Sequence, residues 1–378
     1  MELELPQPLF SQRMLDPGVL HCNHAAVAPW PRAVVEAVES FARENGRQGS
    51  RRYLQWLEVE ARLRQRLAQL INAPHVDTIS LLKNTSEALS VVAWGLDWQP
   101  GDSIVTSDEE FPSNRIVWES LAELGVELRQ ISLAAEDPEG ALLDAMDGST
   151  RLLAISSVQY ASGRRLDMER LGHACSDRDV LFCIDAIQQL GALRLDVQAC
   201  RADFVAADGH KWLLGPEGVA LFYCRAELRD RLHLHQFGWH MTDHPGEFDR
   251  KAWQPALCGR RFECGSPNQL GIHALDAAVG VLLETGMEAI ERAVLARSGY
   301  LLEQLLQDNE VELITPFDSA HRAGIVTFRL KSMEATQAAY EQLQRHGVLC
   351  ALRGGGIRLS PHAWTTQDEL DAVLALIA

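Results

Sequence analysis

The chain has 378 residues, of which 47% are hydrophobic and 23% are charged, the balance of a globular protein with a large core. Its 35 Lys and Arg against 52 Asp and Glu leave a formal net charge of −17, which repels phosphate backbones and argues against nucleic-acid binding. No apolar run approaches the ~18 residues of a membrane span, so no membrane association is expected. The N-terminus is acidic and interrupted by prolines, unlike a signal peptide, and eight scattered cysteines form no C-x-x-C pair. We therefore expect reduced thiols and a cytoplasmic protein.

Short apolar runs alternate with helical patterns through the middle of the chain. This alternation is typical of an α/β fold, in which helices cover a mostly parallel sheet. The predicted strands span residues 78–82, 103–106, 152–156, 180–184, 204–207 and 219–223, and a helix is expected at residues 86–96.

The C-terminal third predicts a smaller α+β unit. Residues 270–306 form a long helical pattern with a break near Gly286. Strands at 324–330 and 357–360 and helices at 333–346 and 367–377 follow. We expect a large domain at residues 20–265 and a small domain at 266–378, with residues 1–19 packed on the small one.

Ligands of open α/β sheets bind where the strands end, and three strand ends carry unusual polar groups. After the first strand, Asn84, Thr85 and Ser86 begin a helix whose free amides can bind a phosphate. An ordinary helix cap uses the same residues, so this segment alone leaves both interpretations open.

The other two strand ends carry a carboxylate and an amine. Asp185 ends an apolar strand, where its charge needs a partner such as a protonated ring nitrogen; alternatively it caps a helix at residues 186–191. Lys211 lies between apolar residues, which favours an imine-forming amine over a surface lysine.

Together the three strand ends describe one ligand. A phosphate, a basic ring nitrogen and an aldehyde are combined in pyridoxal 5′-phosphate (PLP). The glycine fingerprint of dinucleotide sites and the phosphate loop of nucleotide hydrolases are both absent from the sequence, which disfavours a nicotinamide dehydrogenase.

The chain resembles the class V aminotransferases, the fold type I PLP enzymes that include cysteine desulfurases and isopenicillin N epimerases. The resemblance rests on segments spread over most of the chain: NHAA at 23–26, NTSEAL at 84–89, EFPSN at 110–114, DAIQ at 185–188, DGHKWLLGPEG at 208–218, FECGSPN at 262–268 and IRLSPH at 357–362. It implies a large domain with a mostly parallel seven-stranded sheet and a smaller C-terminal α+β domain.

The resemblance also implies roles for individual residues. Lys211 is the catalytic residue that holds PLP as an imine, and Arg358 binds the substrate carboxylate. The implied cofactor contacts are Thr85, Ser86 and His210 at the phosphate, Phe111 stacked on the ring, Asp185 at the ring nitrogen, Gln188 at the phenolic oxygen, and Ser266 reaching the partner subunit's phosphate in a homodimer. Contacts from Asp208 and Tyr160 stay open.

The reaction is an amino-acid transformation at the α-carbon, with three outcomes open. Transamination is the first expectation. It comes first because of the family and because the chain lacks a desulfurase's cysteine loop: Cys350 falls on an apolar strand pattern, unlike an exposed nucleophile. A C–S or C–Se β-lyase reaction is the alternative, because elimination needs only a negative charge on the α-carbon and a leaving group on the β-carbon. Epimerisation comes third, and a non-catalytic PLP-binding protein is the alternative outside enzymes.

Two further groups of polar residues are expected to have no catalytic or metal-binding role. His233, His235, His240 and His244 match no zinc spacing, so no metal is expected. Glu109 and Glu110 are expected at a solvated loop edge.

Overall fold

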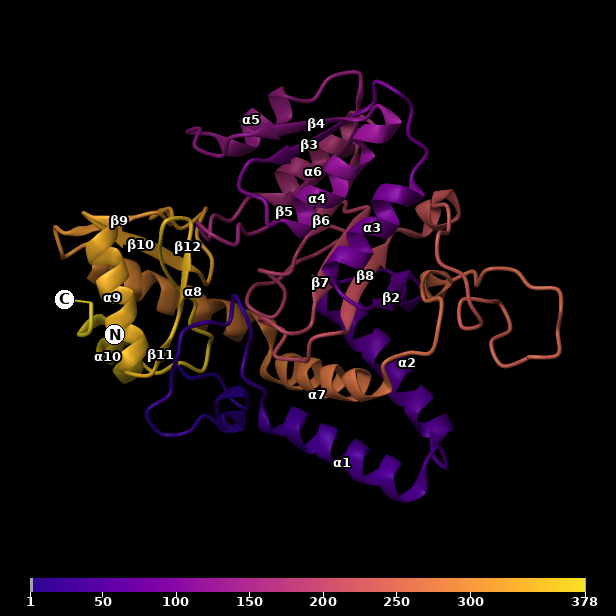
Figure 1. Ribbon diagram of the computed structural model, residues 1–378, viewed down its shortest axis with the longest axis horizontal. Helices are drawn as coiled ribbons and strands as arrows, with labels where there is room; N and C mark the ends of the chain where they lie inside the picture. The colour runs from indigo at the N-terminus through magenta and orange to yellow at the C-terminus, as the bar shows by residue number, and fades with distance from the viewer. Residues whose placement is uncertain (1–2, 378) are drawn as a thin grey trace.

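The computed structural model describes residues 3–377, and its centre is a seven-stranded sheet with the order β2-β8-β7-β6-β5-β3-β4 (Figure 1). Strand β8 is antiparallel to both neighbours, and all other neighbouring strands are parallel. The strands are β2 (Ile79–Leu82), β3 (Ser103–Ser107), β4 (Glu127–Ile131), β5 (Thr150–Ser156), β6 (Leu181–Asp185), β7 (Phe204–Asp208) and β8 (Ala220–Cys224). The expected fold class is confirmed.

Six of these strands lie within two residues of their predicted positions. Strand β4 has no counterpart among the predictions because it is an edge strand with no buried residue. Its sequence ELRQI mixes charged and apolar side chains, so it lacks the continuous apolar run of a central strand.

Alternate residues of the central strands face two different helical layers. Cys183, Phe204 and Ala206 belong to the core beneath helices α3 and α4, whereas Phe182 and Val205 belong to the core beneath α2, α6 and α7. The layers contain α1 (Arg32–Gln48), α2 (Tyr53–Leu70), α3 (Thr85–Gly95), α4 (Ser113–Glu119), α5 (Pro138–Asp144), α6 (Met168–Asp177) and α7 (Gln269–Thr285).

Helices α1 and α2 were not among the predicted elements. Helix α1 lies outermost, along α7 (Figure 1), and Val34 is its one fully buried residue. Apolar Val34, Val38 and Phe41 recur at helical spacing along α1, so an amphipathic pattern was present in the sequence.

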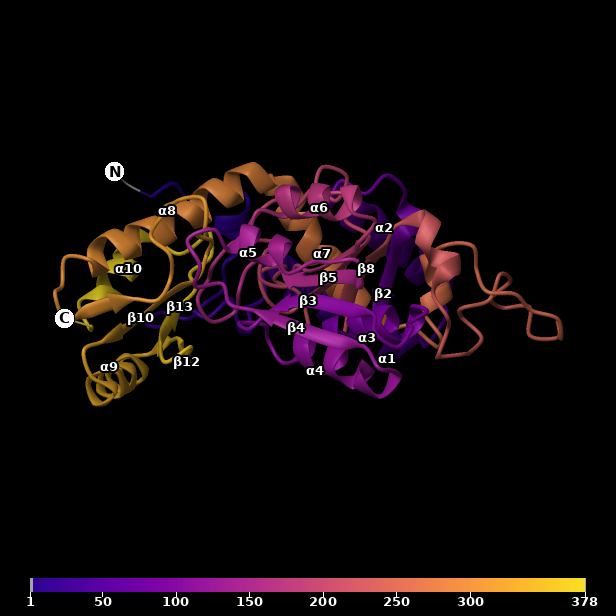
Figure 2. The ribbon, with the colours of Figure 1, turned by 90° about the horizontal axis from the view of Figure 1, so that it is seen from above.

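A second, four-stranded antiparallel sheet of order β12-β13-β10-β9 belongs to a smaller unit, which lies beside the large sheet in Figure 2. The predicted helical break is confirmed: α7 ends and α8 begins around Gly286, whose φ is +88°. The remaining elements are β9 (Val311–Leu313), β10 (Val326–Leu330), β11 (Val348–Leu349), β12 (Ala351–Arg353), β13 (Gly356–Leu359), α8 (Met287–Leu305), α9 (Met333–Arg345) and α10 (Gln367–Leu374).

The N-terminal segment joins this smaller unit. Strand β1 (Leu20–His21) pairs in parallel with β11, and Arg13 forms an ion pair with Glu369. Helix α7, in contrast, packs against α1 and α2 of the larger layer system. The domain boundary near residue 265 stays a prediction.

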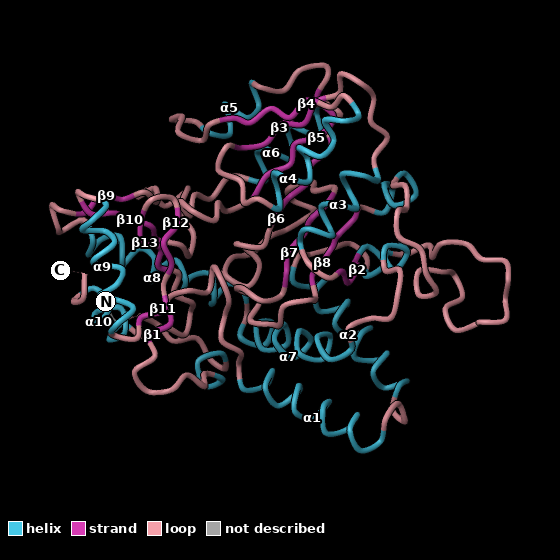
Figure 3. The backbone as a smooth tube through the Cα atoms, in the orientation of Figure 1, coloured by secondary structure: helices cyan, strands magenta, loops and turns pink. Residues whose placement is uncertain are grey.

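Short 3₁₀ helices and one long loop complete the chain. The 3₁₀ helices are η1 (Leu9–Gln12), η2 (Val76–Thr78), η3 (Ser120–Leu124), η4 (Ala226–Arg231) and η5 (Gly259–Phe262). Figure 3 shows the segment between η4 and η5 as a loop that projects from the body of the molecule. Among residues 3–377 no single helix is long and apolar enough to cross a membrane; α7 and α8 pass that test as a pair, but an 85° bend separates them and both bury many residues.

Candidate functional site

The carboxyl ends of β5, β6 and β7 bring the predicted site residues together. Ser156 pairs in register with Asp185, and Asp185 pairs with Ala206, two residues before the end of β7. Because parallel strands end at one edge, the loops after these strands form a single site.

Asp185 is a buried carboxylate with little protein support. Its Oδ1 accepts a hydrogen bond from the Ile187 N–H at 3.0 Å, and residues 186–191 form turns instead of the helix that an Asp cap requires. Burial raises the pKa of Asp185 to about 7; the backbone bond opposes this, and the nearby Glu110 adds to it. The helix-cap alternative is therefore wrong, and the carboxylate is available to a ligand.

Lys211 is buried in the turn that follows β7. The side chain is 8% exposed, and its Nζ lies 5.5 Å from the centre of the Phe111 ring. Burial lowers the pKa of Lys211 to about 8, an effect that Asp185 partly offsets. The surface-lysine alternative is therefore wrong, and the amine is partly neutral near physiological pH.

The first turn of α3 lies beside the end of β7. Asn84 caps the helix by accepting from the Glu87 N–H, and the Thr85 hydroxyl oxygen accepts from the Asp208 N–H at 3.1 Å. The Thr85 hydroxyl proton is left to donate elsewhere. Ser86, the next residue, donates from its hydroxyl to Ser113 at 2.8 Å. The helix start is thus both capped and held against the lysine turn, as a phosphate site requires.

Asp208 is turned towards its own loop. Its Oδ1 accepts from the Gly209 N–H and lies 3.2 Å from Nδ1 of His210, although the angle is poor for a hydrogen bond. The carboxylate therefore faces a backbone donor and the His210 ring of its own turn.

Phe111 and Gln188 occupy the sides of the site. Phe111 is 40% exposed and contacts Tyr160 edge-on, with 5.1 Å between ring centres, so one face of Phe111 is free for stacking. Gln188 donates to the Ala25 carbonyl and accepts from the Trp212 indole, which leaves one amide N–H for a ligand oxygen.

Arg358 reaches the site from β13 of the smaller sheet. It is 2% exposed, its Nη1 donates to the Tyr160 carbonyl at 2.7 Å, and its buried Nε has no partner among the described residues. Burial and the neighbouring Arg353 lower the pKa of Arg358 to about 10. A guanidinium with an unpaired buried N–H is prepared to bind a carboxylate.

Ser266 lies apart from this group. It is exposed, its hydroxyl oxygen is 3.4 Å from the Trp239 indole nitrogen, and it lines a surface hollow with Lys83 and Glu87 near the start of α3. Its contact with a partner subunit's phosphate stays a prediction.

Glu110 is the functional candidate that the sequence analysis misplaced. It is buried and accepts hydrogen bonds from Ser107, Asn114, Ser156 and Gln159, whereas a solvated loop edge was expected. The expectation was wrong because Glu110 folds back over the ends of β3 and β5. Glu110 lies in a loop three residues after the end of β3, so no local pattern in the sequence indicated its burial.

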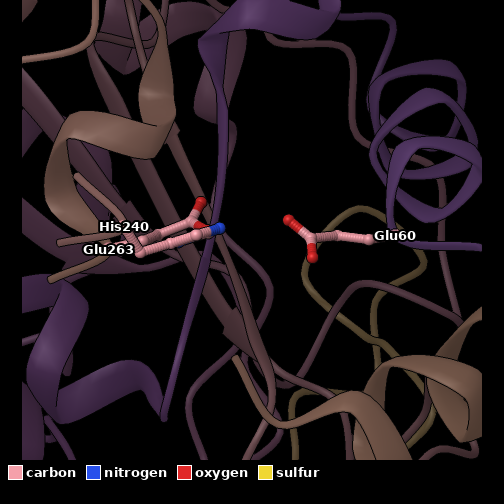
Figure 4. Close-up of side chains that lie close together, drawn as sticks. All are labelled: Glu60, His240 and Glu263. Atoms are coloured by element: carbon pink, nitrogen blue, oxygen red, sulfur yellow. The ribbon is translucent and has the colours of Figure 1, made fainter. Parts of the chain in front are cut away.

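A second buried acidic cluster lies away from the lysine. Figure 4 shows Glu60 facing His240 and Glu263, and ligand atoms of all three lie within 4.8 Å of one another. Arg64 donates to both carboxylates at 2.6–2.7 Å and supplies their positive charge. A metal ion would have to displace this guanidinium, so the donor set favours an ion-pair network.

The geometry fits pyridoxal 5′-phosphate. Lys211 supplies a buried amine for its aldehyde, Asp185 a carboxylate for its ring nitrogen, Phe111 an open face and α3 a helix start for its phosphate. The Lys211 amine, the Asp185 carboxylate and the unpaired Nε of Arg358 are buried polar groups that a bound cofactor and amino acid would satisfy.

Comparison with known proteins identifies the family. Residues 21–373 match the family model described as aminotransferase class-V. The chain therefore belongs to the class V aminotransferases and is a PLP-dependent enzyme.

The named relatives are C–S bond-cleaving enzymes. A probable cysteine desulfurase of Methanothermobacter thermautotrophicus is 28% identical, covering 93% of this chain and 92% of the relative, and a cysteine desulfurase of Yersinia pestis is 30% identical, covering 92% and 86%. The solved structure of the cystine C–S lyase C-DES with its product cysteine persulfide has a TM-score of 0.88 at 25% identity, covering 96% of this chain and 97% of the other. The apo cysteine desulfurase of Thermococcus onnurineus has a TM-score of 0.88 at 26% identity, covering 99% and 98%.

Proposed function

We propose that this enzyme is a PLP-dependent C–S β-lyase that removes a sulfur substituent from a cysteine-derived amino acid, with cystine as the favoured substrate. The observation that supports this most is that Lys211, Asp185 and Arg358 lie together, while among residues 3–377 no cysteine is exposed. The sulfur then leaves as part of a small molecule and does not pass to the protein.

Cys350 is unsuited to accept sulfur. It lies between β11 and β12, is 5% exposed and packs in the core of the smaller unit with Cys22. Burial raises the pKa of the Cys350 thiol to about 11, so the reactive thiolate is scarce at neutral pH. Strand β12 ends at Arg353, and only three glycines, residues 354–356, lie between it and Ile357. This segment therefore has no room for a cysteine-bearing loop before Arg358.

The other cysteines give no clear substitute. Five more are buried, and the two half-buried ones, Cys258 and Cys264, lie around η5. Cys264 donates from its thiol to Gln236 and lines the hollow that contains Ser266. Its place in this hollow makes Cys264 the half-buried thiol to test alongside Cys350.

The site residues divide the chemistry among them. Arg358 holds the α-carboxylate, which fixes the bond from the α-carbon to hydrogen in the position to break. Bound PLP supplies the electron sink for the negative charge left on the α-carbon. Asp185 holds a proton on the ring nitrogen, and the Lys211 amine takes the proton from the α-carbon and can return it to the departing sulfur.

Arg353 supports a substrate with two carboxylates. In the antiparallel pair of β12 and β13, Ala351 is opposite Arg358 and Arg353 is opposite Gly356, so both arginines lie on one sheet face as diagonal neighbours. Arg353 is exposed, donates to its own Leu352 carbonyl and has no carboxylate partner among the described residues, in a chain of net charge −17. Cystine offers one carboxylate to each guanidinium.

The net reaction balances without a further oxidant. Cystine loses its α-hydrogen as a proton while the bond from the β-carbon to sulfur breaks, and the sulfur takes the electron pair and a proton as cysteine persulfide. The remaining three-carbon enamine reacts with water to give pyruvate and ammonia.

The comparisons favour this reaction over transamination, which the sequence analysis placed first. The named relatives are cysteine desulfurases, and the C-DES structure is that of a cystine C–S lyase with its reaction product cysteine persulfide. The homodimer and the cytoplasmic location remain proposals. The dimer is supported by exposed Ser266 and by the projecting loop that exposes Phe237 and Phe248, and a monomeric mass of the PLP-loaded protein would contradict it.

The test uses PLP-loaded enzyme, cystine and no added 2-oxo acid, with pyruvate and sulfane sulfur as readouts. Wild type, Cys350→Ser and Cys264→Ser should form both products at similar rates, and Lys211→Ala should form neither. Loss of turnover in either cysteine variant would instead indicate sulfur transfer through the protein. A requirement for a 2-oxo acid would indicate an aminotransferase.

A further inference from the structure

Glu110 is a buried carboxylate whose two oxygens are surrounded by hydrogen-bond donors. Oε1 accepts from the Ser107 hydroxyl at 3.0 Å, the Ser156 N–H at 2.9 Å and the Gln159 amide at 2.8 Å. Oε2 accepts from the Asn114 amide at 2.8 Å and from the Ser156 hydroxyl. Five donors are therefore directed at the two oxygens of Glu110, and this pocket is built around a hydrogen-bond acceptor.

No cation balances this charge. Within residues 3–377, no Lys, Arg or His lies within ion-pair distance of Glu110, although the chain forms many such pairs elsewhere. A buried charge held by dipoles alone is costly, and its field is weakly screened.

The charge of Glu110 lies next to the ring-nitrogen carboxylate. Ser156, which donates twice to Glu110, is the register partner of Asp185 on the neighbouring strand. Glu110 also directly precedes Phe111, whose ring faces Lys211. The charged groups that act on Asp185 are Glu110, Asp208 and Lys211, and Arg358 and Arg353 act in turn on Lys211.

We propose that Glu110 is a positioning residue of the cofactor site, whose fixed negative charge acts through Asp185 to hold a proton on the ring nitrogen of bound PLP. A protonated ring nitrogen of bound PLP would place a positive charge beside the carboxylates of Asp185, Glu110 and Asp208. Glu110 does not touch the cofactor in this account; it makes the surroundings of Asp185 more negative. The inference rests on PLP binding and not on the lyase reaction.

The experiment compares two ligands on apo-protein by equilibrium titration. One is PLP, and the other is its deaza analogue, in which C–H replaces the ring nitrogen. Glu110→Gln should weaken PLP binding about tenfold, which corresponds to a fall of about one unit in the pKa of the ring nitrogen of bound PLP. The same substitution should change binding of the analogue less than about twofold. A role in folding alone would weaken both ligands equally, and that result would overturn the proposal.

A charge-swapped variant is the matched control. Glu110→Gln combined with Asn114→Asp keeps the net charge, and the new Gln amide can donate to the new carboxylate while the Trp118 indole still donates to residue 114. The ratio of the affinity for PLP to the affinity for the deaza analogue should return towards the wild-type ratio. A ratio that stays at the Glu110→Gln value would contradict a charge effect.

A second variant covers the case in which Glu110→Gln does not fold. Ser156→Ala removes the hydroxyl that ties Glu110 to the strand beside Asp185. It should lower PLP affinity in the same direction and by a smaller factor, with the analogue again little changed. Equal losses for both ligands would overturn the proposal here too. Because neither ligand is turned over, failure of the lyase assignment would leave these results interpretable.

Discussion

The Lys211 amine and the Asp185 carboxylate are buried at one end of the sheet, and each offsets the cost of burying the other. Burial lowers the pKa of Lys211 to about 8 and raises that of Asp185 to about 7, and the attraction between the two opposes both changes. Near neutral pH the protein therefore holds a buried amine and a buried carboxylate, each partly charged. In the function proposed above, PLP would bind the amine and present a protonated ring nitrogen to Asp185.

This pair predicts how the stability of the apo-protein depends on pH. The pKa of Asp185 is above its unfolded value of 3.8, so the free energy of unfolding falls as pH rises from about 4 to about 7. The pKa of Lys211 is below its unfolded value of 10.5, so the free energy of unfolding rises from about pH 8 to about 10. The pair is thus most costly between pH 7 and 8.

The uncharged double variant Lys211→Met/Asp185→Asn measures that cost. In denaturant unfolding of the apo-protein, the free energy of unfolding of this variant should exceed that of wild type by about 1–4 kcal/mol near pH 7.5. The difference should be smaller at pH 5 and at pH 10. A difference that is constant across this range would contradict the pKa directions.

Arg358 should govern substrate affinity and not cofactor affinity. Arg358→Lys keeps the charge but loses the planar pair of donors, so KM for the amino acid should rise about tenfold or more while PLP binding is unchanged. Arg329→Lys is the control, because Arg329 is exposed and pairs with Glu312 on the neighbouring strand of the same sheet. An unchanged KM in Arg358→Lys would remove Arg358 from the site.

Arg353 should distinguish substrates by their number of carboxylates. Arg353→Ala should raise KM about tenfold for cystine, which has two, and leave KM for S-methylcysteine, which has one, nearly unchanged. Steady-state kinetics with both substrates make the comparison. Equal effects on the two would show that Arg353 does not bind the distal carboxylate.

Gly191 should be needed to seat the lysine turn. Its φ is +96°, and a Cβ there would lie 2.1 Å from the carbonyl oxygen of Trp212, the residue after Lys211. Gly191→Ala should destabilise the protein by more than about 2 kcal/mol and weaken PLP binding. Gly265→Ala is the control, since a Cβ at Gly265 meets no atom within 4 Å. Matching thermal unfolding of the two variants would refute this.

The sequence predicts those parts of the site that depend on one strand and the turn after it. Asp185 ends one apolar run, and Lys211 lies in the short turn after another, so both placements could be inferred from local pattern. Glu110 could not, because its burial depends on donors from Asn114 and Gln159, which only the fold brings together. Strand β4 was missed for a related reason, since an edge strand carries no continuous apolar run.

Contacts between the two sheets were also beyond local pattern. The bond from Arg358 to the Tyr160 carbonyl joins residues 198 positions apart. That Arg353 shares a sheet face with Arg358 follows from the register of β12 on β13, which the glycines between them set.

The fate of the carbon chain of ¹³C-labelled cystine tests the central claim most directly. Proton-decoupled ¹³C NMR of the PLP-loaded enzyme, with no 2-oxo acid added, should show labelled pyruvate forming together with cysteine persulfide. Labelled alanine as the product would mean desulfuration through a protein thiol, and no product until a 2-oxo acid is added would mean transamination; either result would contradict the β-lyase assignment.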